Sequence, residues 1–182
     1  MKTYTTKKLE TLLEQHFNKR NEFYVFECTI GWYGSEIVDC IMYNCKREII
    51  CYEIKQSVND LHSKNKLTFI GNKNYFVMPY SLYEKVKTEL YKDYPDVGIY
   101  VAIDRLDEKE ETRTNEYGAT FISHWSEPVD GLTTLYCIKS ARRQDLKADK
   151  EVILSSMLRS MQRDFPIKLN YEFEEGDLDV DD

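Results

Sequence analysis

Two β-like segments joined by a four-residue polar turn are the feature that most constrains the fold of this chain. The first spans residues 36–43 and the second residues 48–55, and the stretch between them suits a hairpin turn. A hairpin here brings Asp39 close to Glu53 on the neighbouring strand. Because side chains alternate along a strand, Glu53 and Lys55 point to the same side. The sequence therefore predicts two carboxylates and an ammonium that meet at one point.

A short motif of this kind also arises by chance, so its setting in the sequence matters. The alternative is that Glu53 and Lys55 are charged residues that only solvate the end of a strand. Asp39 is more informative, because it interrupts the apolar run Ile37–Met42 in a strand that is predicted to be central. A charge in such a place is costly unless it is paired or bound to a metal ion. The setting of Asp39 therefore favours a functional site.

The rest of the pattern predicts an α/β (α+β) fold with a mixed central sheet flanked by helices. Periodic apolar residues predict helices over residues 5–18, 59–69, 82–90 and 149–164, and β-rich runs predict strands over residues 23–30, 36–43, 48–55, 74–78, 97–103 and 132–138. Residues 105–118 are polar and charged, and we expect a loop there. The first eight elements follow the order α-β-β-β-α-β-α-β.

Composition and charge indicate one globular domain with an acidic end. The chain has 182 residues, of which 42% are hydrophobic and 13% aromatic, as in a folded domain with one sizeable core. Its net charge is −7, but residues 172–182 hold seven acidic residues and no basic ones, and without them 25 acidic residues balance 25 Lys and Arg. We therefore expect a neutral single domain over residues 1–171, with a C-terminal helical extension, and a disordered acidic tail over residues 172–182.

The cysteines and the N-terminus bear on the compartment. The five cysteines have no CxxC spacing and lie mostly in apolar runs, so buried reduced thiols are expected rather than a zinc site. The N-terminus lacks the apolar stretch of a signal peptide, and no segment approaches the length of a membrane span. We expect a cytoplasmic protein that does not bind membranes.

The segments around the hairpin resemble a known group of nucleases. Residues 37–39, 53–61, 66–67 and 74–79 are similar to the PD-(D/E)XK nuclease superfamily and, more narrowly, to the MmcB-type DNA-repair proteins and their phage-encoded relatives. That branch carries an E-x-K-S-S-x-x-D-F core followed by a lysine, and the matching positions here are Glu53, Lys55, Ser57, Asp60 and Lys66. Gln56 and Leu61 depart mildly from this core, and Val38 stands in place of the proline of the superfamily's name.

The resemblance implies a restriction-endonuclease-like αβββαβ core and a metal-dependent nuclease that hydrolyses DNA phosphodiester bonds in DNA repair or processing. Asp39 and Glu53 would ligate Mg²⁺ (or Mn²⁺), with the carbonyl of Ile54 as a further ligand. Lys55 would position the attacking water and offset phosphate charge. DNA is the implied partner.

Further residues are candidates for supporting roles. Members of the superfamily often add a glutamate from the first helix. Glu10, which borders the buried face of that helix, is the first choice here, and Glu14 is the second. Asp60 is also interpreted as the N-cap of the second helix. The candidates for contacts with the DNA backbone are Lys64, Lys66, Lys73, Arg142 and Arg143, although solvated surface residues would show the same pattern.

Alternatives from other classes stay open. One is a catalytically inactive nuclease-fold protein that binds nucleic acid or a protein partner. Another is a phage-encoded inhibitor that mimics DNA with its acidic tail. The tail could equally solubilise the protein, compete with DNA for the basic residues, or recruit a basic protein partner. A homodimer is also compatible with the sequence.

Overall fold

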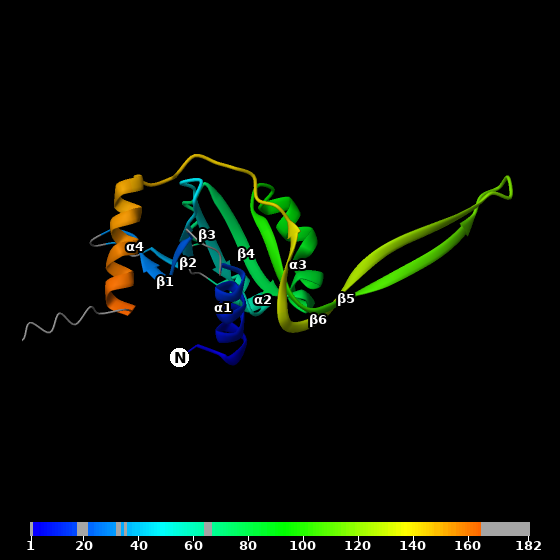
Figure 1. The fold of residues 1–182 in the computed structure, drawn as a ribbon, viewed down its shortest axis with the longest axis horizontal. Helices are drawn as coiled ribbons and strands as arrows, with labels where there is room; N and C mark the ends of the chain where they lie inside the picture. Colours follow the sequence, from blue (N-terminus) through cyan, green and yellow to red (C-terminus); the bar gives the residue numbers. More distant parts are fainter. Residues whose placement is uncertain (1, 18–21, 32–33, 35, 64–66, 165–182) are drawn as a thin grey trace, which may run out of the picture.

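The computed structural model describes residues 2–17, 22–31, 34, 36–63 and 67–164 of the chain. This part of the chain forms a six-stranded mixed sheet with four helices around it (Figure 1). The helices are α1 (Tyr4–Phe17), α2 (Val58–Leu61), α3 (Tyr80–Asp93) and α4 (Lys150–Asp164), and the strands are β1 (Phe23–Thr29), β2 (Ile37–Tyr43), β3 (Ile49–Ile54), β4 (Lys73–Pro79), β5 (Gly98–Thr114) and β6 (Thr120–Lys139). The predicted α/β class, with helices flanking a mixed sheet, is confirmed.

The strands lie in sequence order across the sheet, from β1 to β6. β1, β2 and β3 pair antiparallel through short connections. β3, β4 and β5 pair parallel, and their connections carry α2 and α3, because a parallel neighbour can be reached only by a crossover. β5 and β6 are again antiparallel. The order α1-β1-β2-β3-α2-β4 agrees with the predicted αβββαβ succession.

Helices cover both faces of the sheet, because its central strands are apolar on both sides. Val77 of β4 packs in one cluster with Leu9 of α1. Phe76, one residue earlier and therefore on the opposite face, packs with Val86 and Leu90 of α3. The site described below lies beside this central part of the sheet.

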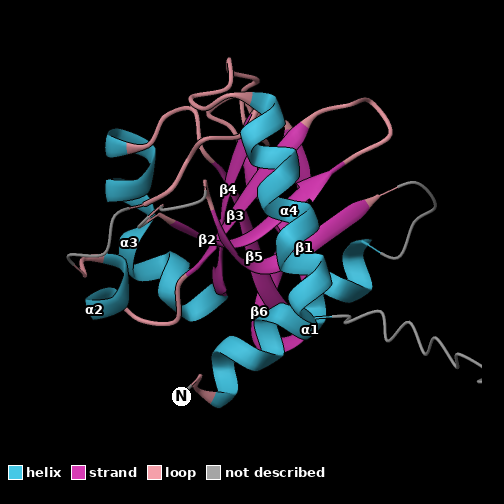
Figure 2. Cartoon of the chain, turned by 90° about the vertical axis from the view of Figure 1, so that its left-hand side faces the viewer, coloured by secondary structure: helices cyan, strands magenta, loops and turns pink. Residues whose placement is uncertain are grey.

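α4 covers the sheet next to β1, as Figure 2 shows. Ile153 and Met157 of this helix are buried in one cluster with Val38 of β2 and Cys51 of β3. This contact fixes the hairpin of β2 and β3 from the side opposite α1.

The second helix is shorter than the sequence predicted. We expected a helix over residues 59–69, but α2 ends at Leu61, and the described residues that follow residues 64–66 are not helical. The backbone N–H of Thr68 donates instead to the side chain of Glu53 at 3.2 Å. The backbone at Thr68 therefore contacts β3 and does not continue the helix.

The loop predicted over residues 105–118 is wrong. β5 and β6 continue past the body of the protein as a two-stranded ribbon of residues 104–130, which we call the arm (Figure 1). Its strands pair from Arg105↔Val129 to Thr114↔Thr120. Alternating hydrophobicity marks a strand only where one face is buried, and nearly all side chains of the arm are exposed on both faces. The strands predicted over residues 97–103 and 132–138 are therefore only the body portions of β5 and β6. The remaining predicted elements are confirmed, with small differences at their ends.

Candidate active site

The β2–β3 hairpin brings the two predicted carboxylates together. Its turn closes where the N–H of Asn44 donates to the carbonyl of Glu48 at 3.1 Å and the side-chain oxygen of Asn44 accepts from the N–H of Glu48 at 2.9 Å. The register pairs Cys40 with Tyr52, so the preceding residue Asp39 faces the end of β3. The predicted hairpin is therefore confirmed.

Asp39 is held by the backbone at the end of β3. Its Oδ2 accepts a hydrogen bond of 2.8 Å from the N–H of Ile54. Burial raises the pKa of Asp39, while this hydrogen bond and the ammonium of Lys55 act in the opposite direction. The carboxylates of Asp60 and Glu10 raise the pKa further. Asp39 therefore lies in a partly buried and electronegative place.

Glu53 and Lys55 point the same way from β3, as predicted. Both are buried, with exposed fractions of 3% and 6%, and their Oε2 and Nζ atoms are 3.6 Å apart. Burial and then the charge of Asp39 raise the pKa of Glu53 to about 7, against the opposing effect of Lys55. The N–H of Lys55 donates to the carbonyl of Val77 at 2.9 Å, which ties this end of β3 to β4. Two acids and one base thus share a small buried volume.

These groups open onto a cleft of about 490 Å³. The residues that line it are Lys2, Thr6, Glu10, Glu27, Glu36, Ile37, Asp39, Glu53, Ile54, Lys55, Gln56 and Asp60. The predicted group of Asp39, Glu53, Lys55, Ile54 and Glu10 is therefore collected in one place, whereas the second choice on the first helix, Glu14, is exposed and is not among the lining residues. Acidic side chains outnumber basic ones on the wall of the cleft.

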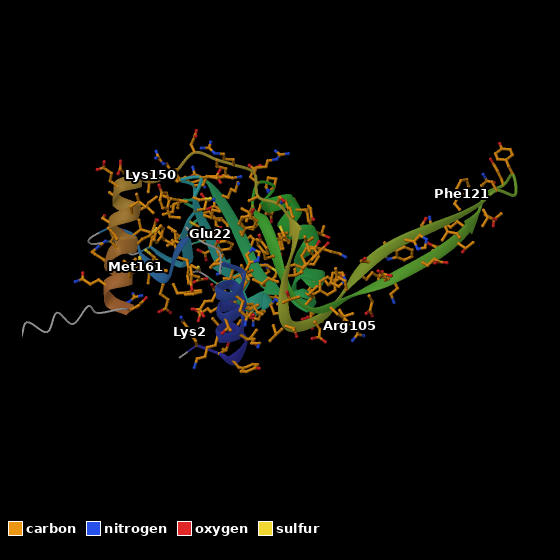
Figure 3. The ribbon with its side chains drawn as sticks, viewed as in Figure 1. Lys2, Glu22, Arg105, Phe121, Lys150 and Met161 are labelled. Carbon is orange, nitrogen blue, oxygen red and sulfur yellow. The ribbon has the colours of Figure 1, made fainter. Side chains whose placement is uncertain are left out.

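Glu10 reaches the cleft in contact with a residue that sequence reasoning missed. The ammonium of Lys2 lies 2.7 Å from Glu10 Oε1 and 3.0 Å from Glu27 Oε1, so it joins α1 to β1. Figure 3 shows Lys2 next to the first helix. Glu27 has a φ of 50°, a left-handed conformation that is uncommon outside glycine, and it interrupts the apolar residues of β1. A charge inside an apolar run was the only sequence signal for Glu27, and Lys2 had none.

The residues of the cleft fit a divalent cation of the magnesium type. Asp39 and Glu53 provide carboxylate oxygens. Burial raises the pKa of each, and a bound cation would favour their charged forms. Within the described ranges, no three His, Cys, Asp or Glu side chains are grouped closely enough to hold a metal ion. Mg²⁺ takes one or two carboxylates and keeps several waters, so two acids with the carbonyl of Ile54 are sufficient.

A capping arrangement fixes the chain directly after Lys55. The side chain of Ser57 accepts from the N–H of Asp60 at 3.2 Å and is the N-cap of α2. The Oδ2 of Asp60 accepts from the N–H of Gln56 at 3.0 Å. The interpretation of Asp60 as the N-cap is therefore wrong, because Ser57 lies one position before the first helical residue. Asp60 instead orients the backbone beside the cleft.

The candidates for DNA contacts are not gathered at the cleft. Lys64 and Lys66 lie outside the described residues. Lys73 and Arg143 both pair with Glu48, at 3.2 and 3.4 Å, near the start of β3 rather than its end. Arg142 pairs with Asp96 at 3.4 Å. The described candidates therefore form part of another surface.

Comparisons with known proteins find a similar fold but indicate no function. No protein-family model matches the chain, and no curated protein matches it. Among solved structures, the SPO1766 protein of unknown function from Silicibacter pomeroyi is similar, with a TM-score of 0.58 and 12% identity over 91% of this chain and 95% of that one. A likeness at this identity shows a shared fold alone. Separately, none of the helices in the described ranges has both the length and the apolar composition needed to cross a bilayer.

Proposed function

We propose that this protein is a metal-dependent, nuclease-like protein that hydrolyses DNA phosphodiester bonds in DNA repair or processing. The observation that carries the proposal is the convergence of Asp39, Glu53 and Lys55 at one buried end of the β2–β3 hairpin. The resemblance of the sequence around these residues to PD-(D/E)XK nucleases supports the same function. The cleft of about 490 Å³ has room for a phosphate group, and a bound divalent cation would offset the surplus of acidic side chains on its wall.

Each residue of the cleft has a separate role in the proposed hydrolysis. Asp39, Glu53 and the carbonyl of Ile54 would hold Mg²⁺ or Mn²⁺. When bound, such an ion offsets charge on the phosphate and lowers the pKa of water. Lys55 lies next to Glu53, where its ammonium orients the attacking water and stabilises negative charge at phosphorus. The water gives up a proton as its oxygen forms a bond to phosphorus and the bond to the leaving oxygen breaks. The leaving oxygen takes up a proton from solvent, so that one water molecule is added in total. Glu10 borders the same cleft and shapes its charge.

The proposal extends to the compartment. All five cysteines are free thiols, and three of them are buried. Unpaired cysteines are typical of proteins in a reducing compartment. We therefore place this activity in the cytoplasm.

The test is a cleavage assay with the full-length protein. Labelled single-stranded, duplex and branched DNA are incubated with Mg²⁺ or Mn²⁺ and with the wild type, Glu53→Gln or Lys55→Ala. Lys87→Ala, on the exposed side of α3, serves as a control because it leaves the cleft intact. The proposal predicts cleavage by the wild type and the control, and loss in both site variants. Cleavage that survives both site substitutions would show that a contaminant or another site is responsible.

A second candidate is a nuclease-fold protein that binds nucleic acid or a protein partner without cutting. The observation that favours it is the ammonium of Lys2, which satisfies Glu10 and Glu27 and so puts a positive charge in the cleft without a metal ion. Binding of DNA in the same assay, with no cleavage under either metal ion, would support this candidate against hydrolysis.

A further inference from the structure

Among the residues that the structure describes, almost none covers the arm, whose side chains are nearly all exposed. Its ten residue pairs extend away from the sheet, and Figure 3 places Arg105 near its base and Phe121 near its far end. A two-stranded ribbon on its own is at best marginally stable in water, and ribbons of this kind gain stability by packing against another surface. Leu106 and Ile122 are nevertheless 40% and 57% exposed. The arm therefore has the properties of a docking element.

The base of the arm is fixed to the body, so its direction is set before any partner binds. Oδ1 of Asp130 accepts from the N–H of Ser81 at the start of α3, at 3.0 Å. The hydroxyl of Thr133 donates to Oδ1 of Asp104 at 2.6 Å. Gly131 allows a close approach, since a Cβ there would lie 2.5 Å from that of Asp104. A fixed arm loses little conformational entropy on docking.

The two faces of the arm differ in charge. Directly paired residues share a face, and every printed pair in the arm joins two odd-numbered or two even-numbered residues, so we call the faces odd and even. All three Lys and Arg of the arm lie on the odd face, where Arg105 pairs with Asp107 at 2.7 Å and Arg113 with Glu111 at 2.8 Å. The even face has no Lys or Arg, and the charged and apolar residues among its paired positions are Glu108, Glu110, His124, Leu106, Ile122 and Pro128. The even face is thus acidic and partly apolar.

The overall charge of the arm argues against a nucleic acid as its partner. Residues 104–130 contain eight acidic residues and three Lys or Arg. A surplus of five negative charges repels a phosphate backbone, which proteins bind through surplus positive charge. A basic protein surface is the complementary partner.

Such a surface exists on this chain itself. Residues 139–150 connect β6 to α4 and contain five Lys or Arg against two acidic residues. Arg142, Arg143 and Lys147 are exposed along it. We propose that two copies of this chain dimerise by exchanging arms, with the even face of each arm on the 139–150 segment of the other copy. The contact is isologous, so it closes at two copies.

The area is adequate for a stable dimer. Ten residues of strand span about 34 Å, and two strands are about 10 Å wide, so one face of the arm covers about 340 Å². Each copy buries one face of its own arm and the surface that receives the partner's arm. The two copies together then bury about 1,400 Å², which is within the range of standard protein–protein interfaces.

A charge-exchange experiment tests the proposal. The first variant reverses the even face, Glu108→Lys with Glu110→Lys, and the second reverses the receiving surface, Arg142→Glu with Arg143→Glu and Lys147→Glu. The mass in solution is measured by light scattering across the micromolar range at low and physiological salt. We expect the wild type at twice the chain mass of 21.7 kDa, and each variant alone at once that mass, because each now opposes like charges.

Mixing the two variants supplies the decisive result. Each contact in the mixed dimer is again between opposite charges, so the mixture is expected to return to twice the chain mass. The matched control reverses two acids on the odd face of the same arm, Glu111→Lys with Glu127→Lys, and is expected to remain dimeric. Circular dichroism of every variant checks that the fold is kept.

Three outcomes would overturn the proposal. A monomeric wild type at low salt would exclude the dimer. If removal of the arm also weakened DNA binding, the arm would be a contact for nucleic acid instead. A mixture that stays monomeric would exclude the pairing of these two surfaces. A control that dissociates like the first variant would show that the even face is not the docking face. None of these results depends on DNA cleavage. The exchange of arms is therefore tested independently of the proposed function.

Discussion

Asp39 and Ile54 are joined by a 2.8 Å hydrogen bond from the backbone N–H of Ile54 to Oδ2 of Asp39. The bond links β2 to the residue directly after Glu53, so it holds the first acid beside the second. Two carboxylates whose pKa values are both raised, mainly by burial, stand next to the buried ammonium of Lys55. Raised pKa values at a cleft are typical of functional sites, because such an arrangement is costly for stability alone.

The first prediction concerns Asp39→Asn. The amide oxygen of asparagine can still accept from the N–H of Ile54, so we expect a loss of stability of less than about 1 kcal/mol. The lost carboxylate should reduce the rate of DNA cleavage by on the order of a thousandfold. Cleavage rates and thermal unfolding measure the two effects. Asp93→Asn, at the exposed end of α3, is the control, and equal rates for the two variants would contradict the role of Asp39.

The raised pKa of Glu53 should make the free energy of unfolding depend on pH. Its pKa is 4.5 in an unperturbed chain and about 7 in the folded protein. Between these values the unfolded chain has released a proton that the folded protein keeps, so the free energy of unfolding falls as pH rises from 4.5 to about 7 and the effect levels off beyond. The difference amounts to roughly 3 kcal/mol at most.

Urea unfolding at a series of pH values, in buffer free of divalent metal ions, measures this slope. Glu53→Gln should remove most of it and leave the smaller part due to the raised pKa of Asp39, whereas the exposed control Glu84→Gln should keep it all. Parallel curves for the wild type and Glu53→Gln would show that Glu53 has an ordinary pKa in the folded protein.

Lys55→Met should separate catalysis from metal binding. The substitution removes the ammonium 3.6 Å from Glu53 and keeps a side chain of similar length in a buried position. We expect cleavage to fall by about a hundredfold or more, since a positioned proton-transfer or water-orienting group contributes that much. Mn²⁺ affinity should stay equal or rise, because a positive charge has left the site. A parallel fall in metal affinity would mean that Lys55 only supports the fold of the site.

Lys2→Met tests the contact between α1 and β1. The ammonium of Lys2 is partly exposed, so its pairs with Glu10 and Glu27 should contribute no more than about 1 kcal/mol to stability. Its removal makes the cleft more negative, and we expect Mn²⁺ to bind several-fold more tightly than in the wild type. Lys2→Arg keeps the charge and should bind Mn²⁺ as the wild type does. Unchanged affinity in Lys2→Met would place Lys2 outside the electrostatic reach of the site.

Much of the site could be predicted because its information is local. The polar turn at Asn44 fixes the register of the hairpin, and the register places Asp39 at Glu53. Alternation along one strand was enough to orient Glu53 and Lys55 together. The same local rules predicted the helices and strands whose apolar faces are buried.

The remainder depends on contacts between distant segments. Lys2 pairs with both Glu10 and Glu27 only because α1 packs on the sheet near β1. No sequence pattern around Lys2 predicts that packing. The arm has no buried face, so its strands carry no alternation that sequence reasoning could detect. The end of α2 was misplaced for a similar reason, since Thr68 bonds to Glu53 from another element.

The most direct test of the site is a calorimetric titration of Mn²⁺ into the full-length wild type and into Asp39→Asn at a pH above 7, where Glu53 is ionised. The account predicts saturable binding to the wild type and binding at least about tenfold weaker to Asp39→Asn, in keeping with the loss of a metal ligand. Equal affinity in the two proteins, or no binding to the wild type, would contradict a cation site built on Asp39 and Glu53.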